Sequence, residues 1–369
     1  MLGMVHLIKG RLEKRFIRVL QKGYSSSDFT MRTREGDLIK TENHVIFDVK
    51  GLVHPTDKVI AFPRYIPSPT GNRASGKELY RKVYNLDERF KYLQQNMPNL
   101  IVHDEVFDEI LCEVPADIIK GHYDPIDKLE ILRTSNSLRP LEEKAVRLAE
   151  DLKEAAGIPW NAIGISGSVL VGLYKAKSDL DPIVYGVEAC GRAYAALEDL
   201  LDDDDSRFKR YSSEGLHALF DFRSKDTVMN FEDFARVERR KAFQGMFEGA
   251  DYFMRFVKGW NEVSEQYGDM NYKNSGYAKI TATIVDDAET LFTPCTYKLK
   301  DVTVVEGGKI ELISEIASFR GRFCEQAKQG ETVTAQGKVE HVTNMKTGEE
   351  HYRIILGNKP ADYMVLSCG

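Results

Sequence analysis

The apolar pattern of the first 110 residues changes from strand-like to helix-like. Residues 44–49 and 58–62 are rich in β-branched and aromatic side chains, which favour strands, and the loop at residues 51–57 separates them. We expect these strands to form a small antiparallel sheet. Residues 78–97 show helical periodicity, and residues 106–110 are predicted to begin another helix.

A longer amphipathic helix is predicted for residues 140–156. Its apolar side chains recur at three- and four-residue steps, Pro140 suits a first turn, and Gly157 begins a helix stop. The short apolar run at residues 162–165 follows and predicts a strand. Further predicted elements are helices at residues 195–201 and 231–247 and a strand at residues 251–257.

The last part of the chain shows the pattern of short strands. Ile280, Ala282 and Ile284 alternate with polar residues, which predicts a strand. Later runs with strand composition, separated by glycine-containing turns, lie at residues 302–305, 333–339 and 352–356. This regular spacing predicts a small β-barrel. Residues 335–357 are similar to an OB-fold, a barrel that often binds single-stranded nucleic acid, and a barrel that only packs is the alternative.

The mixture of predicted strands and helices indicates an α+β protein, and the length of the chain indicates several domains. A chain of 369 residues exceeds one ordinary core, and we expect an N-terminal β-rich domain (1–133), a central domain (134–298) and a C-terminal barrel domain (299–369). With 51 Lys and Arg against 57 Asp and Glu, the net charge is −6. This charge argues against a strongly basic nucleic-acid binder but allows a local basic groove.

The cysteine pattern and the apolar runs indicate the compartment. Five scattered cysteines without a C-x-x-C pair support neither a disulfide framework nor a zinc ribbon. No apolar run reaches eighteen residues, and the N-terminus lacks the apolar core of a secretory signal. We therefore expect a cytoplasmic protein without a membrane segment.

Residues 163–186 contain the most closely spaced candidate catalytic and ligand-binding residues. Gly167 and Ser168 follow the apolar run, and Asp179-Leu180-Asp181 then leads into another predicted strand. Two carboxylates one residue apart at the head of a strand point to the same face. A glycine-serine turn leaves backbone N–H groups and a hydroxyl able to face an anion. Together these features suggest metal-assisted phosphoryl or nucleotidyl transfer.

This segment resembles the nucleotidyltransferase superfamily of DNA polymerase beta. That family carries an apolar residue, Gly-Ser, about ten residues, and then Asp-apolar-Asp-apolar; here Pro182 replaces the last apolar residue. Proline donates no ladder hydrogen bond, so the strand must start there or lie at an edge. Longer stretches are similar to an archaeal group of predicted nucleotidyltransferases of unknown substrate, namely VKGLVHPTDKVIAFPRYIP, SDLDPIVYG, ERRKAFQG and DYFMRFVK.

The resemblance implies a central mixed sheet with helices and a set of site residues. Asp179 and Asp181 would be catalytic residues that hold Mg²⁺ or Mn²⁺, and a nucleoside monophosphate would move from an NTP to an acceptor hydroxyl. The implied nucleotide contacts are Gly167, Ser168, Lys175, Lys177 and Arg255. A third metal-binding carboxylate is expected from a later strand, with Asp251 as the first candidate and Asp221 and Asp287 as its rivals.

Several further charged segments have a structural and a functional interpretation. Residues 71–77 fit G-x-x-x-x-G-K, but Glu78 replaces the Mg²⁺-binding Ser or Thr, so we predict a basic loop and not a P-loop. The nearby cations that could help to hold a polyanion are Arg64, Arg73, Lys77, Arg81 and Lys82. Residues 202–205 are predicted to form a solvated acidic loop, and residues 236–241 either a solvated basic face or a phosphate contact.

The sequence is compatible with two classes of acceptor and with a protein that has no catalytic activity. RNA or DNA is one acceptor class, and a small molecule or protein is the other. A non-catalytic nucleic-acid-binding protein that keeps the fold is the rival to an enzyme. For the nucleic-acid alternative, the barrel residues that would stack bases or neutralise phosphates are Phe319, Arg320, Arg322, Phe323, Tyr352 and Arg353.

Overall fold

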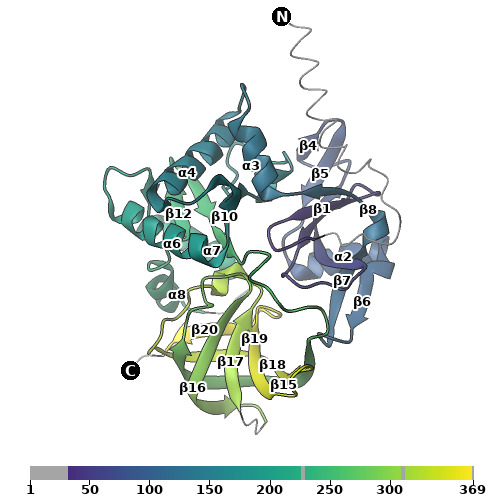
Figure 1. The fold of residues 1–369 in the computed structure, drawn as a ribbon, viewed down its shortest axis with the longest axis vertical. Coiled ribbons are helices and arrows are strands. Elements are labelled where there is room, and N and C mark those ends of the chain that lie inside the picture. The colour runs from purple at the N-terminus through teal and green to yellow at the C-terminus, as the bar shows by residue number, and fades with distance from the viewer. Residues whose placement is uncertain (1–31, 226–228, 309–311, 368–369) are drawn as a thin grey trace, which may run out of the picture.

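The computed structural model describes residues 32–225, 229–308 and 312–367. Residues 4–23 are rich in Lys and Arg, which predicts either a solvated surface element or a phosphate-binding arm, and they lie outside this part of the chain. The architecture is mixed α+β, with several sheets and few helices (Figure 1). An N-terminal sheet, a helix-covered central region and a C-terminal barrel are arranged around a common meeting point. In the described residues, no helix is both long and apolar enough to cross a membrane.

The N-terminal sheet has eight strands in the order β4-β5-β3-β2-β1-β8, with β7 also paired to β3 and β6 paired to β7. Its strands are β1 (Leu38–Thr41), β2 (Ile46–Val49), β3 (Lys58–Pro67), β4 (Arg73–Ser75), β5 (Glu78–Lys82), β6 (Ile101–Asp104), β7 (Glu109–Pro115) and β8 (Ile119–Tyr123). The antiparallel pairing of β2 with β3 confirms the predicted pair of strands. Helix α2 (Leu86–Asn96) packs on this sheet through Leu93, which is fully buried in the same apolar core as Phe47.

Two predicted helices of this region are wrong in whole or in part. Residues 78–82 form β5, and helix α2 begins only after Asn85, whose side chain accepts a hydrogen bond from the backbone of Glu88. Residues 106–110, where a helix was predicted to begin, form the end of the turn between β6 and β7 and the first two residues of β7. There the Asp104 carboxylate accepts hydrogen bonds from two following backbone N–H groups, a local bond that competes with helix formation.

The central region places helices on a three-stranded sheet of order β14-β10-β9. Its elements are α3 (Pro125–Arg133), α4 (Pro140–Ala156), β9 (Ile163–Ile165), α5 (Gly167–Leu170), β10 (Pro182–Tyr185), α6 (Val187–Asp202) and β14 (Arg255–Val257). Helix α4 ends at Gly157 with φ of 59°, as predicted. Strand β10 is antiparallel to β9 and parallel to β14. Pro182 is its first residue, which satisfies the expectation that a strand containing this proline must start there.

A smaller sheet and two helices follow, in which one predicted helix proves too long. The elements are β11 (Phe208–Lys209), α7 (Ser213–Arg223), α8 (Phe231–Glu238), β12 (Gln244–Phe247) and β13 (Ala250–Phe253). The helix predicted for residues 231–247 ends at Glu238, because Lys241 turns into the core and forms an ion pair of 2.6 Å with that glutamate. Arg240 pairs with Glu331 of the barrel, so residues 236–241 do not form one solvated basic face.

The C-terminal strands close into a five-stranded barrel, which confirms the predicted barrel. Strands β15 (Met270–Asp286), β16 (Cys295–Glu306), β17 (Ile313–Ser318), β19 (Glu350–Leu356) and β18 (Thr332–Asn344) follow one another around it, and β20 (Tyr363–Leu366) pairs with β18. The barrel begins at Met270 and not near residue 299. The reason is that β15 pairs with both β16 and β18, and alternation in the sequence predicts a strand but not its partners. Short 3₁₀ helices lie at Pro98–Leu100, Ala116–Ile118, Trp160–Ala162 and Gly321–Phe323.

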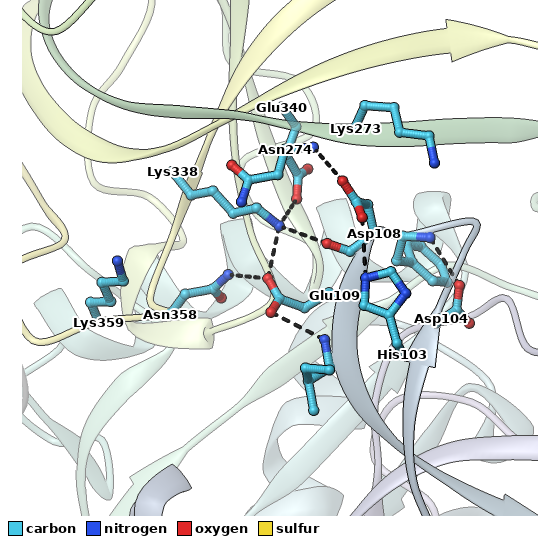
Figure 2. A network of polar contacts seen from close by, with 12 residues as sticks. His103, Asp104, Asp108, Glu109, Lys273, Asn274, Lys338, Glu340, Asn358 and Lys359 are labelled. Atoms are coloured by element: carbon cyan, nitrogen blue, oxygen red, sulfur yellow. Dashed lines mark hydrogen bonds and ion pairs between the residues drawn. The ribbon is translucent and has the colours of Figure 1, made fainter.

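The β6–β7 hairpin attaches the N-terminal sheet to the barrel. Lys338 on β18 lies 2.8 Å from a carboxylate oxygen of Glu109, and the backbone N–H of Asn274 on β15 donates to Asp108 over 2.8 Å (Figure 2). The rings of Phe107 and Tyr272 stack with centroids 5.4 Å apart. This polar and aromatic contact fixes the position of the sheet relative to the barrel.

Candidate functional site

The glycine-serine turn lies directly against the second aspartate of the motif. The backbone N–H of Ser166 donates to the carbonyl of Asp181 over 2.8 Å, which joins the end of β9 to the start of β10. Gly167 follows with φ of +61°, and a Cβ built on it would overlap the Asp181 carboxylate. Only glycine therefore allows both this backbone conformation and this approach.

Ser168 has a hydroxyl without a hydrogen-bond partner in the described part of the chain. Its side chain is fully buried. A buried hydroxyl without a hydrogen-bond partner lowers the stability of the folded protein by about 1–3 kcal/mol. Such a hydroxyl beside the turn is therefore a candidate to form a hydrogen bond with a ligand. Lys175 and Lys177 are exposed on the loop between α5 and β10 that leads to Asp179.

The two aspartates of the motif interact strongly with each other. Burial raises the pKa of the Asp181 carboxyl, and the charge of Asp179 raises it further, to about 6, although Lys82, Arg255 and Arg64 act in the opposite direction. Two carboxylates that oppose each other's ionisation are a common feature of sites that hold a cation or a proton. The same interactions show that three cationic side chains lie near the pair.

The N-terminal sheet supplies two of these cations. Arg64 lies on β3 and Lys82 on β5, two antiparallel neighbours in the sheet. Arg73 of β4 also reaches the central region, where it donates a hydrogen bond to the carbonyl of Leu173. Of the remaining cations that the sequence suggested, Lys77 and Arg81 are exposed, and Arg81 forms an ion pair with Glu88.

Arg255 connects the aspartate pair to a buried group of charges in the N-terminal sheet. Strand β14 places Arg255 opposite Ile183 of β10, and its guanidinium lies 3.1 Å from a carboxylate oxygen of Glu35. Lys50 pairs with Glu35 at 3.2 Å and with Asp48 at 3.0 Å. Burial alone would raise the pKa of Asp48, but Lys50 and the nearby arginines hold it below its ordinary value.

The sequence contains two indications of these buried charges outside the glycine-serine and aspartate motif. Asp48 interrupts the otherwise apolar run of residues 45–49 and is 7% exposed. Arg89 stands three residues after Leu86 and four before Leu93, which is a core-facing position of α2. A charged residue at an expected core position is rarely buried without a specific reason.

The segment just before β1 locks the N-terminal sheet onto the motif. The hydroxyl of Ser166 donates to the carbonyl of Gly36 over 2.6 Å, and Gly36 has φ of +99° with its Cα against the Ile183 side chain. The Arg34 guanidinium stacks on the ring of Tyr185, 3.5 Å from its centroid. The site is therefore shared between the central region and the N-terminal sheet.

Of the three candidates for a third carboxylate, Asp251 lies nearest to the aspartate pair in the fold. It is on β13, which lies beside the segment that carries Asp179 and Asp181. The backbone N–H of Leu180 donates to the carbonyl of Asp251, and Leu180 bridges to Tyr252 in parallel, so the register places Asp251 beside Asp179. The Asp251 side chain is exposed and hydrogen-bonded to Tyr211. The described part of the chain has no group of three or more His, Cys, Asp or Glu side chains arranged to hold a metal ion.

The two rivals lie elsewhere. Asp221 is on an exposed face of helix α7 and not on a strand. Asp287 belongs to the turn after β15 in the barrel, where its carboxylate accepts a hydrogen bond of 2.9 Å from the backbone of Gln329. The structure thus brings together Gly167, Ser168, Asp179, Asp181 and Arg255. The role of Asp251 stays a prediction.

The aspartate pair fits a divalent cation. Carboxylate oxygens are the ligands that Mg²⁺ prefers, and a cation would relieve the repulsion that raises the pKa of Asp181. The positive side chains around the pair would face the phosphate groups of a substrate that coordinates Mg²⁺. The residues present therefore fit a metal–phosphate ligand on the basis of charge and donor type.

We expect the stability of the metal-free protein to depend on the ionisation of Asp181. Its pKa rises from the ordinary value of 3.8 to about 6 on folding, so the folded state binds this proton more tightly than the unfolded state. The resulting stabilisation is present below about pH 4 and is lost as the pH rises through about 6. Urea unfolding in EDTA should show that Asp181→Asn gains stability relative to the parent over this pH range. A difference that is constant with pH would contradict the prediction.

Comparison with known proteins identifies a relative but no fold neighbour. No family model matches the chain, and no solved structure is significantly similar to it. The chain is 31% identical over 345 residues to the "uncharacterized protein MJ1086" of Methanocaldococcus jannaschii, an alignment that covers 89% of this chain and 96% of that relative. Because the similarity extends over nearly the full length of both proteins, the chain belongs to the same family as this archaeal protein.

Proposed function

We propose that the protein is a metal-dependent nucleotidyltransferase that moves a nucleoside monophosphate from an NTP to an acceptor hydroxyl. The observation that carries this proposal is the packing of Gly167 on the Asp181 carboxylate. It places a turn suited to phosphate and a carboxylate pair suited to a cation in one site. The resemblance to the nucleotidyltransferase superfamily of DNA polymerase beta rests on the same residues.

Each group of the site has a role in this reaction. Asp179 and Asp181 would hold Mg²⁺, which when bound would neutralise phosphate charge and favour attack by the acceptor oxygen. The backbone at Gly167 and the buried hydroxyl of Ser168 would bind the β- and γ-phosphates. Arg255 would face the charge that develops on the leaving pyrophosphate. Lys175 and Lys177, exposed on their loop, would contact the same phosphates.

The atoms of the proposed reaction balance without a further reactant. The acceptor oxygen forms a bond to the α-phosphorus, and the bond from that phosphorus to the pyrophosphate oxygen breaks. The acceptor hydroxyl loses its proton to solvent, and pyrophosphate leaves. The site therefore needs to bind and orient two substrates and to compensate negative charge, which are the functions that its residues can provide.

Incubation of the protein with each α-labelled NTP, Mg²⁺ or Mn²⁺ and total cellular RNA tests the proposal. Transfer of label to RNA, to the protein or to a small molecule would support nucleotidyl transfer and would identify the acceptor class. Absence of label under every condition, together with absence of metal–NTP binding in calorimetry, would refute it. Nucleic-acid binding without labelling would favour the non-catalytic alternative, to which the lack of a three-carboxylate group among the described residues also points.

A nucleic-acid acceptor is supported by one part of the barrel. Its circular strand order, with β17 parallel to β19, suits the five-stranded Greek-key barrel of an OB-fold. Of the residues predicted to contact bases, Phe323 is in the core and Arg353 is buried against Glu340. Phe319 is 37% exposed and lies close to Gly51, beside the charges around Asp48.

We expect Phe319→Ala in the full-length protein to weaken binding of single-stranded RNA by about fivefold to hundredfold, because one stacked base contributes about 1–3 kcal/mol. Val305→Ala, which truncates an exposed apolar side chain on β16 of the same barrel, is the matched control. Fluorescence titration at low and moderate salt measures both, and affinity should fall as salt rises. Equal affinity of the Phe319 variant and the parent would exclude this surface as the acceptor site.

A further inference from the structure

Arg89 of helix α2 is a buried arginine without a full set of partners. It is 7% exposed, and its Nε has no hydrogen-bond partner in the parts of the chain that the structure describes. A carboxylate oxygen of Asp48 lies 4.0 Å from its Nη2, but the same oxygen is 3.0 Å from Lys50. Burying a guanidinium in this state is costly unless another anion completes its bonding.

Three other arginines from different parts of the fold lie near enough to influence this residue electrostatically. Burial lowers the pKa of Arg89 to about 10, and the charges of Arg64, Arg320 and Arg255 contribute to the decrease. Arg64 comes from β3, Arg255 from β14, and Arg320 from the barrel segment after β17. The barrel therefore contributes a cation to the place where the N-terminal sheet meets the central region.

Each of these three arginines is held in position by the protein. A nitrogen of Arg64 donates to the carbonyl of Val83 over 3.4 Å, and Nε of Arg320 donates to the carbonyl of Gly357 over 3.0 Å. Arg255 is held by Glu35. Guanidinium groups that converge on one place repel each other, and proteins use such groups where a phosphate is to be bound in a bidentate manner.

The balance of charge favours an anion at this place. Among the residues that the structure describes, the group of charged side chains contains six cations, Lys50, Arg64, Lys82, Arg89, Arg255 and Arg320, and four carboxylates, Glu35, Asp48, Asp179 and Asp181. The cations differ in whether they influence Asp181, Arg89 or both. Lys82 acts on Asp181 and Arg320 acts on Arg89, whereas Arg64 and Arg255 act on both.

We propose that Arg89, with Arg64 and Arg320, forms an anion-binding subsite for a phosphate group of the acceptor. The proposal rests on the proposed function, in which Gly167, Ser168 and the aspartate pair take the NTP and leave Arg89 and Arg320 for the second substrate. The acceptor is then a phosphorylated molecule that carries the reacting hydroxyl. Phe319, next to Arg320 in sequence, would offer its exposed ring to a base of the same acceptor.

Calorimetric titration of the full-length protein with inorganic phosphate in EDTA tests the subsite without the metal-dependent nucleotide site. We expect saturable binding that Arg89→Met weakens by at least about tenfold, since the variant loses a charge-assisted hydrogen bond. Arg81→Met is the matched control, because Arg81 is an exposed arginine on β5 of the N-terminal sheet, and this variant should bind phosphate within about twofold of the parent. Asp181→Asn should bind phosphate at least as tightly as the parent.

A second arginine variant keeps the test informative if Arg89→Met does not fold. If circular dichroism shows that Arg89→Met is unfolded, Arg320→Met, which changes a less buried side chain, should give the same loss. Absence of saturable phosphate binding in the parent, or parent-like binding in folded Arg89→Met and Arg320→Met, would overturn the subsite. Loss of phosphate binding in Asp181→Asn would assign the anion to the aspartate site instead.

A competition experiment determines which substrate the phosphate belongs to. With Mg²⁺ and a saturating non-hydrolysable NTP analogue present, a 5′-phosphorylated dinucleotide should bind at least about tenfold more tightly than its 5′-hydroxyl form. If the analogue abolishes phosphate binding, the arginines hold the nucleotide's own phosphates and the acceptor assignment is wrong. If phosphate still binds but no NTP is ever bound or transferred, the proposed function fails while the anion subsite stands.

Discussion

The double variant Asp179→Asn with Asp181→Asn is expected to lose metal–NTP binding and transfer while it keeps or gains stability. Asparagine preserves the shape of each side chain but removes the charge that would hold a divalent cation. The pKa of Asp181 is raised to about 6 by burial and by Asp179, so ionisation of this carboxyl opposes folding at neutral pH. Removing both charges therefore relieves repulsion in the metal-free protein.

Calorimetry with Mn²⁺ and NTP should show at least a hundredfold weaker binding in the double variant, or about 3 kcal/mol. A matched control is Asp203→Asn with Asp205→Asn, which removes two carboxylates from the exposed turn after α6 and should leave binding unchanged. A double variant that binds metal–NTP as tightly as the parent would refute the aspartate pair as the metal site. A double variant that is much less stable than the parent would show that the pair has a structural role.

The second large effect is expected for Gly167→Ala, with Gly172→Ala as its control. Both glycines have positive φ, +61° and +70°, so an alanine is strained at either position, by about 1 kcal/mol. A Cβ at Gly167 would also overlap the Asp181 carboxylate, whereas a Cβ at Gly172 meets nothing within 4 Å. The two substitutions share the backbone cost and differ only in the displacement of Asp181.

We expect Gly167→Ala to reduce nucleotide transfer by about a hundredfold or more and Gly172→Ala to reduce it by at most a few fold, because a small displacement of a reacting group can cost about that factor. Both variants should remain folded, with Gly167→Ala the less stable in urea unfolding. Nucleotide affinity and transfer measured on folded protein distinguish the cases. If both variants behave alike, the contact between Gly167 and Asp181 has no function beyond the conformation of the turn.

The local features of this protein follow from neighbouring residues in the sequence. Helix α4 ends at Gly157 because a glycine can adopt the left-handed conformation there, and β10 begins at Pro182 because proline cannot continue a strand ladder on that side. The motif predicted a glycine-serine turn and then two carboxylates at the head of a strand; the structure has α5 at Gly167 and begins β10 directly after Asp181. In each of these cases the cause and the effect lie within a few residues of each other.

Where local patterns conflicted with other bonds, the prediction from sequence was wrong. The apolar spacing of residues 106–110 suits a helix, but the Asp104 carboxylate bonds two backbone N–H groups and forms a turn instead. The predicted helix at residues 231–247 ends early because Lys241 is buried and paired with Glu238. Periodicity describes which face of an element is apolar and does not include these specific bonds.

The partners of the site depend on contacts between residues far apart in the chain, which no local pattern contains. The sequence pattern predicts the strand that carries Arg255. It does not predict the hydrogen bond of Arg255 to Glu35, which lies 220 residues away in the chain. The barrel begins at Met270 because β15 pairs with β18, about sixty residues later. Tertiary packing, and not the sequence pattern, brings Arg89 beside Asp48 and Arg320 near Arg89, and burial makes Asp181 resist ionisation. The motif could thus be located from the sequence, while the charges that surround it are set by how the N-terminal sheet, the central region and the barrel pack together.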